Sequence, residues 1–188
     1  MQRERATVTR ERDVNVFAEL SHGNAVILEN AQEKRDGYYY EAIASVVFSA
    51  FKFEAFLNHL GDRVLPFWSE LERLPHANKL NALATQLNVS IDRSCRPFQT
   101  LTELFRARDG LAHGKPEYIK TKAVETGTRE ELRRRKPQAK WETVCNVEFA
   151  ERAHRDTEQI AETLWEAAGF NAADLHQCGH SYSISSVQ

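Results

Sequence analysis

Apolar side chains recur at helical spacing along most of the chain. The clearest run covers residues 38–60, where positions three and four apart form one apolar face of a long helix. These positions are Ile43, Val46, Val47, Ala50, Leu57 and Leu60. Phenylalanines add apolar surface on the other faces, so we expect this helix to be central to the fold or to a subunit interface. Glu54 interrupts the apolar seam and needs a partner, because burying an unpaired carboxylate is costly.

The same spacing predicts several further helices and one region of different character. The further helices are expected over residues 15–34, with a break at 21–24, and over 66–74, 76–87, 97–108 and 147–168. Residues 114–146 begin with a turn at Gly114-Lys115-Pro116, and residues 118–124 alternate in a way that is typical of a short strand. The pattern therefore predicts an all-α fold with a short irregular or β-containing excursion around residues 115–146.

The size of the chain fits this architecture. A length of 188 residues favours one domain, and 8 glycines with 5 prolines are too few for a sandwich or barrel of many short strands. We expect a charged, loosely ordered N-terminus over residues 1–13, a single helical domain over 14–170 and a flexible tail over 171–188.

The composition bears on three properties: contact with nucleic acid, disulfide bonds and insertion into a membrane. The formal net charge is −2, so contact with nucleic acid has to depend on a local patch, and the densest one is Arg133, Arg134, Arg135 and Lys136. Three widely spaced cysteines do not form a disulfide framework and fit a reducing, cytoplasmic setting. No stretch approaches the roughly 20 apolar residues of a membrane span, so we expect no membrane contact.

The segment with candidate chemistry follows the helix predicted over residues 97–108. Arg108 and His113 are five residues apart, which places them roughly 140° apart on an ideal helix of 3.6 residues per turn. Gly110 lies between them and lowers the cost of a kink or a helix end, so the sequence predicts that the helix ends near Gly110 and that the two side chains converge. Asp109 is then placed to bond a backbone N–H or to orient His113.

Arg108, Asp109 and His113 in this arrangement resemble the Arg-x4–6-His motif of the HEPN superfamily. The helical runs at residues 44–60 and 97–105 are similar to the helices that surround the motif in HEPN-like bacterial proteins. Many members carry Asn at the position of Asp109, and an acid there repels a phosphate slightly more. The resemblance covers about residues 38–115 and, more loosely, the last helix.

The resemblance implies a HEPN-like helical bundle with an up-and-down core. It also implies a homodimer in which two motifs face each other and cleave RNA without a metal or another cofactor. Arg108 would bind the phosphate, His113 would transfer protons, and Asp109 would position His113. We expect Glu54 and Asn58 to orient Arg108, and the basic run at 133–136 to contact RNA. A biological role as a toxin, with an antitoxin partner, or as a phage-defence or stress element would follow.

Several alternatives stay open at this point. The same fold can bind RNA or a nucleotide without cutting it, and Arg108 can be the structural partner of Glu54 in a plain dimerisation domain. Tyr118 and Trp141 can stack on bases or pack the excursion onto the bundle. His176, Cys178 and His180 alternate in the tail, but a fourth ligand is not evident, so we predict no metal site.

Overall fold

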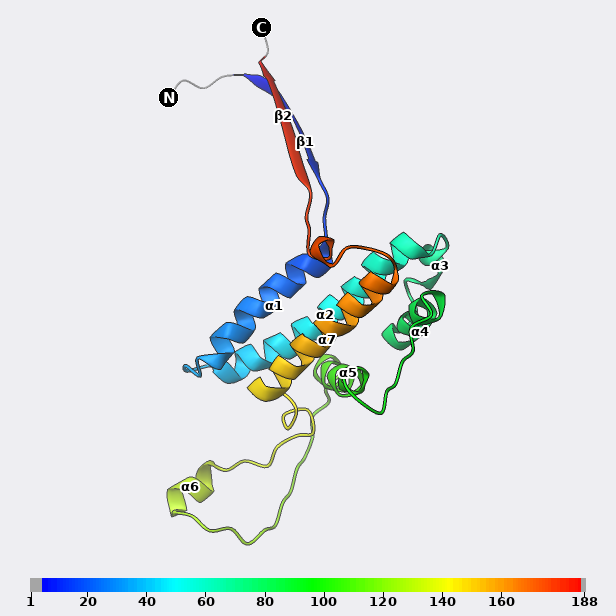
Figure 1. Cartoon of the computed structure of the whole chain (residues 1–188). Helices are drawn as coiled ribbons and strands as arrows, with labels where there is room; N and C mark the ends of the chain where they lie inside the picture. The colour runs from blue at the N-terminus through cyan, green and yellow to red at the C-terminus, as the bar shows by residue number, and fades with distance from the viewer. Residues whose placement is uncertain (1–4, 187–188) are drawn as a thin grey trace. The chain divides into compact units, whose positions relative to one another are not determined.

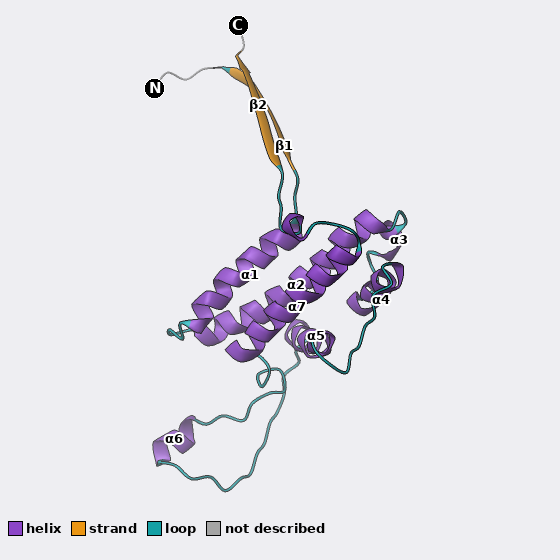
Figure 2. Cartoon of the chain, in the orientation of Figure 1, coloured by secondary structure: helices purple, strands orange, loops and turns teal. Residues whose placement is uncertain are grey.

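The computed structural model describes residues 5–186, and helices dominate this part of the chain (Figures 1 and 2). The elements in chain order are β1 (Ala6–Arg12), α1 (Val16–Gln32), α2 (Tyr38–Val64), α3 (Trp68–Leu71), α4 (His76–Gln86), α5 (Phe98–Ala112), α6 (Arg129–Arg134), α7 (Val147–Ala167), the 3-10 helix η1 (Ala172–Asp174) and β2 (His180–Ser186). The predicted mostly helical fold is confirmed. Within residues 5–186, no helix combines the length and the apolar character needed to cross a bilayer.

The helices form two compact units, which we describe separately. Unit 1 comprises residues 5–22, 51–91 and 160–186, and unit 2 comprises residues 23–50 and 92–159. The helices α1, α2 and α7 each contribute residues to both units. The candidate motif around Arg108 belongs to unit 2.

Aromatic packing forms the centre of unit 1. Phe17 of α1 meets Phe56 of α2 edge to face, with 5.3 Å between the ring centroids, and both side chains are buried. The ring of His176 stacks on Phe17 at 5.0 Å. Next to α2, the indole of Trp68 lies directly over Gly61, where a Cβ atom would come within 2.3 Å of the ring. Gly61 therefore does not end α2, which continues to Val64, but leaves room for Trp68.

The two ends of the described chain pair in unit 1. β1 and β2 form an antiparallel ribbon in which Thr9 is opposite Ser183, and Figure 1 shows the two strands side by side. Asn15 secures the base of this ribbon, because its side-chain amide donates to the carbonyl oxygen of Leu175 at 3.0 Å. The sequence predicts loosely ordered ends over residues 1–13 and 171–188 and gives no sign of this strand pair. Residues 1–4 and 187–188 lie outside the described residues.

A buried carboxylate joins α5 to α7 in unit 2. Asp156 is fully buried and accepts hydrogen bonds from Arg96 at 2.8 and 2.5 Å and from the hydroxyl of Thr100 at 2.5 Å. Burial alone would raise the pKa of Asp156, but the hydrogen bonds from Arg96 and Thr100 and the nearby guanidinium charges outweigh it, so the pKa lies below its ordinary value. Glu103 of α5 and Arg152 of α7 form a second ion pair between these helices.

The excursion after α5 is almost entirely exposed. Figure 2 shows it as loop except for α6, whose first turn is closed by a capping box between Thr128 and Glu131. The predicted strand over residues 118–124 is absent, and Tyr118 is 91% exposed, so it does not pack the excursion onto the helices. Trp141 packs the end of the excursion onto α5, because its Cβ atom lies 3.5 Å from the position that a Cβ atom added to Gly110 would take.

Replacing two helical glycines tests this packing. Gly61→Ala places a methyl group inside the ring of Trp68, so we expect a loss of unfolding free energy of about 2 kcal/mol. Gly23→Ala meets only Phe48 at 3.4 Å, an ordinary contact, so the better helix propensity of alanine should stabilise the fold by about 0.5–1 kcal/mol. Chemical denaturation of both variants checks the opposite signs. A Gly61→Ala variant as stable as the unchanged chain would contradict the packing around Trp68.

Candidate functional site

The helix that carries the motif, α5, ends later than the sequence predicts. α5 continues through Gly110 to Ala112, and the backbone N–H of His113 still donates to the carbonyl oxygen of Asp109 at 2.9 Å. The predicted helix end near Gly110 is therefore wrong. A glycine inside a helix costs only about 1 kcal/mol relative to alanine, and here the helix packs against Trp141.

The continuous helix sets the relation between the two motif side chains. With regular geometry of 3.6 residues per turn, Arg108 and His113 leave α5 in directions roughly 140° apart. A kink at Gly110 that would bring them together is absent. Within one copy, therefore, the guanidinium and the imidazole leave the helix in different directions.

Arg108 is held in place by neighbours on its own helix. Its side chain is 21% exposed, and its Nη1 atom lies 3.1 Å from the carboxylate of Asp109. The guanidinium carbon sits 5.3 Å from the ring centroid of Phe105, a cation–π distance. Within residues 5–186, the carboxylate of Asp109 makes no hydrogen bond to His113. Asp109 therefore pairs with the guanidinium of Arg108 and does not orient the imidazole.

His113 occupies the exposed end of α5. It is the C-cap residue of the helix, and its side chain is exposed. The next residue, Gly114, packs closely on the last turn, since a Cβ there would lie 2.9 Å from the carbonyl oxygen of Gly110. The glycine that the local geometry requires is therefore Gly114, and the chain turns away from α5 directly after His113.

The two side chains expected to orient Arg108 lie in unit 1. The carbonyl oxygen of the Asn58 side chain accepts a hydrogen bond from the amine of Lys79 at 2.9 Å. Lys79 is buried, and desolvation lowers the pKa of its amine, while the charges of Glu54 and Glu72 counteract this shift. Sequence reasoning missed Lys79, and an orienting role of Glu54 and Asn58 toward Arg108 stays a prediction.

The basic run follows the motif in the exposed excursion. Residues 115–140 hold nine basic and four acidic residues, a net charge of +5, whereas the rest of the chain holds 16 basic and 23 acidic residues. Arg134 pairs with Glu130 at 2.6 Å, and Arg135 pairs with Glu125 at 2.7 Å. Arg133 and Lys136 are exposed and lie in no ion pair within residues 5–186. These two cations are thus the most available for phosphate oxygens.

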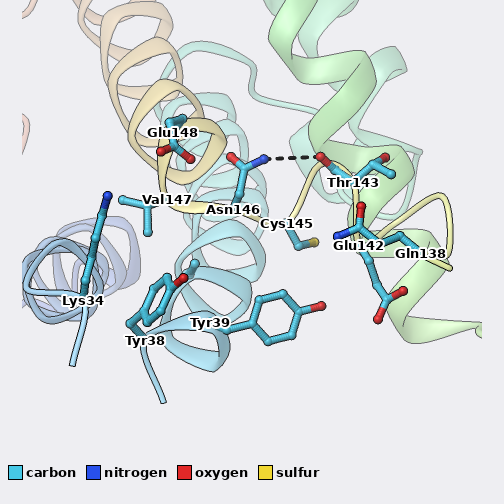
Figure 3. Close-up of a pocket in the computed structure, with 11 residues that line it drawn as sticks. Lys34, Tyr38, Tyr39, Gln138, Glu142, Thr143, Cys145, Asn146, Val147 and Glu148 are labelled. Atoms are coloured by element: carbon cyan, nitrogen blue, oxygen red, sulfur yellow. Dashed lines mark hydrogen bonds between the residues drawn. The ribbon is translucent and has the colours of Figure 1, made fainter. Parts of the chain in front are cut away.

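A cavity of about 270 Å³ opens near the start of α2 in unit 2 (Figure 3). Tyr38 and Tyr39 line it together with Cys145, which is fully buried. Burial raises the pKa of the Cys145 thiol to about 11, so the sulfur stays protonated and is not an activated nucleophile. Asn146 caps α7 beside it, accepting from the backbone N–H of Phe149 at 2.8 Å. The cavity is lined by one cation, Lys34, and by two carboxylates, Glu142 and Glu148, so its charge does not favour an anion.

A second cavity, of about 540 Å³, lies in unit 1 beside His59. Desolvation and the charge of Arg63 lower the pKa of His59 to about 4, so the imidazole is neutral near pH 7. Its Nδ1 atom accepts from Arg63 at 3.1 Å, and its ring stacks on Trp165 at 5.5 Å. Three carboxylates line the cavity, and they belong to Asp13, Asp62 and Glu72. These three negative charges outnumber the single guanidinium in the lining, that of Arg63, so the cavity repels a phosphate.

The tail residues do not assemble into a ligand set. His176 stacks on Phe17, and His180 belongs to β2. In the part of the chain that the structure describes, no three His, Cys, Asp or Glu side chains are grouped as metal ligands would be. The cysteines are all free, and Cys95 and Cys178 are exposed. Comparisons with models of protein families, with curated protein sequences and with solved structures found no match to this chain.

Proposed function

We propose that the protein is a metal-independent endoribonuclease of HEPN type that works as a cytoplasmic homodimer. The observation that supports this proposal most is the position of His113. It is an exposed imidazole at the end of α5, five residues after Arg108, and the chain enters the segment of net charge +5 two residues later. A titratable ring, a fixed cation and a polycation thus lie next to one another along the chain.

The reaction needs only groups that two copies of this chain supply. A neutral His113 removes the proton of a ribose 2′-hydroxyl, whose oxygen then attacks phosphorus. The bond from phosphorus to the 5′-oxygen breaks, and the leaving oxygen takes a proton from the imidazolium of the second copy. The products are a 2′,3′-cyclic phosphate and a free 5′-hydroxyl. Arg108 stabilises the charge that builds on the phosphate oxygens.

The dimer is part of the proposal for a geometric reason. Because α5 is continuous, Arg108 and His113 of one copy diverge by roughly 140° around the helix axis. Two motifs that face each other supply an arginine from one copy and a histidine from the other. A toxin controlled by an antitoxin, or a phage-defence or stress protein, would use such an activity.

One observation favours binding without cleavage as a second candidate. The guanidinium of Arg108 already faces the carboxylate of Asp109 at 3.1 Å, and this carboxylate neutralises part of the charge that a phosphate would meet. In that case the excursion binds RNA through its cations and no strand is cut. Asp109→Asn separates the two candidates, because it should raise cleavage if the acid opposes phosphate binding.

His113→Ala tests the enzymatic proposal. We expect cleavage of a mixed RNA pool in the presence of EDTA to fall by about 100-fold or more, because a proton-transfer group is lost. His22→Ala is the control, since His22 is an exposed histidine on α1 outside the motif. The measurement is the amount of new RNA ends that carry a cyclic phosphate. Equal cleavage by both variants would rule out the assigned role of His113.

A charge reversal tests RNA contact by the excursion. In a variant that joins Arg133→Glu with Lys136→Glu, we expect weaker RNA binding and a salt dependence reduced by about one unit of slope for each lost phosphate contact. The control joins Arg73→Glu with Arg155→Glu, which changes the net charge equally at exposed sites elsewhere. Filter binding across a salt series measures both. If the two double variants weaken binding equally, only the overall charge matters and the excursion is not the contact.

A further inference from the structure

The ribbon of β1 and β2 has two strands and therefore two open edges. The pairing runs from Ala6 opposite Ser186 to Arg12 opposite His180. An isolated two-stranded ribbon is marginally stable in water, and an open strand edge presents unpaired N–H and C=O groups to another strand. In this ribbon the strands come from opposite ends of the described chain, so no tight turn joins them.

The two edges differ in their protection. β1 carries charges at Arg10, Glu11 and Arg12, and charged side chains on an edge strand oppose the addition of another strand. From Ser181 to Ser185, β2 has no charged side chain. Serines alternate there with two large side chains, Tyr182 and Ile184, which are 67% and 63% exposed. The edge of β2 is thus the open one.

We propose that the β2 strands of two copies pair antiparallel about Ser183, giving a four-stranded sheet in the order β1-β2-β2-β1. A twofold axis perpendicular to this sheet places Ser183 opposite Ser183 of the partner subunit. It also places Tyr182 opposite Ile184 of the partner subunit, an aromatic and β-branched pair of the kind that stabilises adjacent strands. Ser181 then faces Ser185 of the partner subunit on the other side of the sheet.

The pattern of β2 favours a second copy over an unrelated strand. The order of serine and large apolar residues reads the same in both directions from Ser183, so the strand is complementary to its own reverse. A slip of one residue would put Tyr182 opposite a serine and exchange the two faces. The charged β1 strands become the outer edges, so the assembly closes at two copies, as expected for a twofold interface.

The proposal uses only residues of unit 1 and does not depend on the nuclease proposal. The sequence-based expectation of a homodimer came from the resemblance of the motif in unit 2 and named no contact. One pair of edge strands is a small interface, so the dimer should dissociate on dilution. This concentration dependence makes the interface measurable by sedimentation velocity on the full chain.

Charges placed on the proposed twofold axis test the pairing. Ser183→Lys puts two ammonium groups directly opposite each other, and Ser183→Glu does the same with two carboxylates, so each variant alone should dissociate at least 10-fold more readily than the unchanged chain. An equimolar mixture of the two should form the dimer again, because lysine then faces glutamate. The control is Thr9→Lys, which carries the same charge on β1, opposite Ser183 within one copy, and should remain dimeric.

Three results would overturn the proposal. One is an unchanged chain that stays monomeric at every concentration. Another is a dimer that withstands Ser183→Lys, which would place the contact elsewhere on the chain. The last is a mixture of the lysine and glutamate variants that stays monomeric, because lysine opposite glutamate on the twofold axis should restore the pairing. Circular dichroism monitors the helices, which do not include residue 183.

Discussion

The hydrogen bond from the N–H of His113 to the carbonyl oxygen of Asp109 belongs to a helix that continues two residues beyond Gly110, to Ala112. This single extension decides the geometry of the candidate site. It keeps Arg108 on a regular helix, beside Asp109 and Phe105, and it puts His113 at the exposed end. The two side chains then diverge around the helix axis. In the proposed reaction, the contact between two subunits is therefore part of the chemistry.

The surroundings of α5 in unit 2 fix this helix and leave its end accessible. The buried carboxylate of Asp156 binds Arg96 and Thr100 and so ties the start of α5 to α7. At the other end, the excursion leaves after Gly114 and returns at Trp141, which packs beside Gly110. Both ends of the basic segment are therefore anchored at the motif. In this way, a chain with a net charge of only −2 concentrates positive charge next to its candidate proton-transfer group.

Local sequence patterns predict where the helices lie. They do not predict helix ends and strand pairs that depend on contacts with residues far away in the sequence. The apolar spacing located α2, α5 and α7, since periodicity reports which face of a helix is buried. The sequence predicts a helix end at Gly110 because a glycine can serve as a stop or as room for a neighbour, and only the packing of Trp141 distinguishes these uses. Serine alternates with a large side chain over residues 181–185, and this pattern can be seen in the sequence. Its partner strand begins at Ala6, however, and no local rule pairs segments so far apart.

Subunit complementation is the most direct measurement of the central claim, that the guanidinium and the imidazole at one phosphate come from different copies. Arg108→Ala and His113→Ala are each prepared as inactive proteins, mixed in equal amounts and allowed to exchange subunits. RNA cleavage should then rise clearly above that of either variant alone but stay below the original rate, because a mixed dimer regains an arginine from one copy and a histidine from the other and still lacks the second imidazolium that protonates the leaving oxygen. A mixture that stays as inactive as its components, although mixed dimers form, would contradict the account.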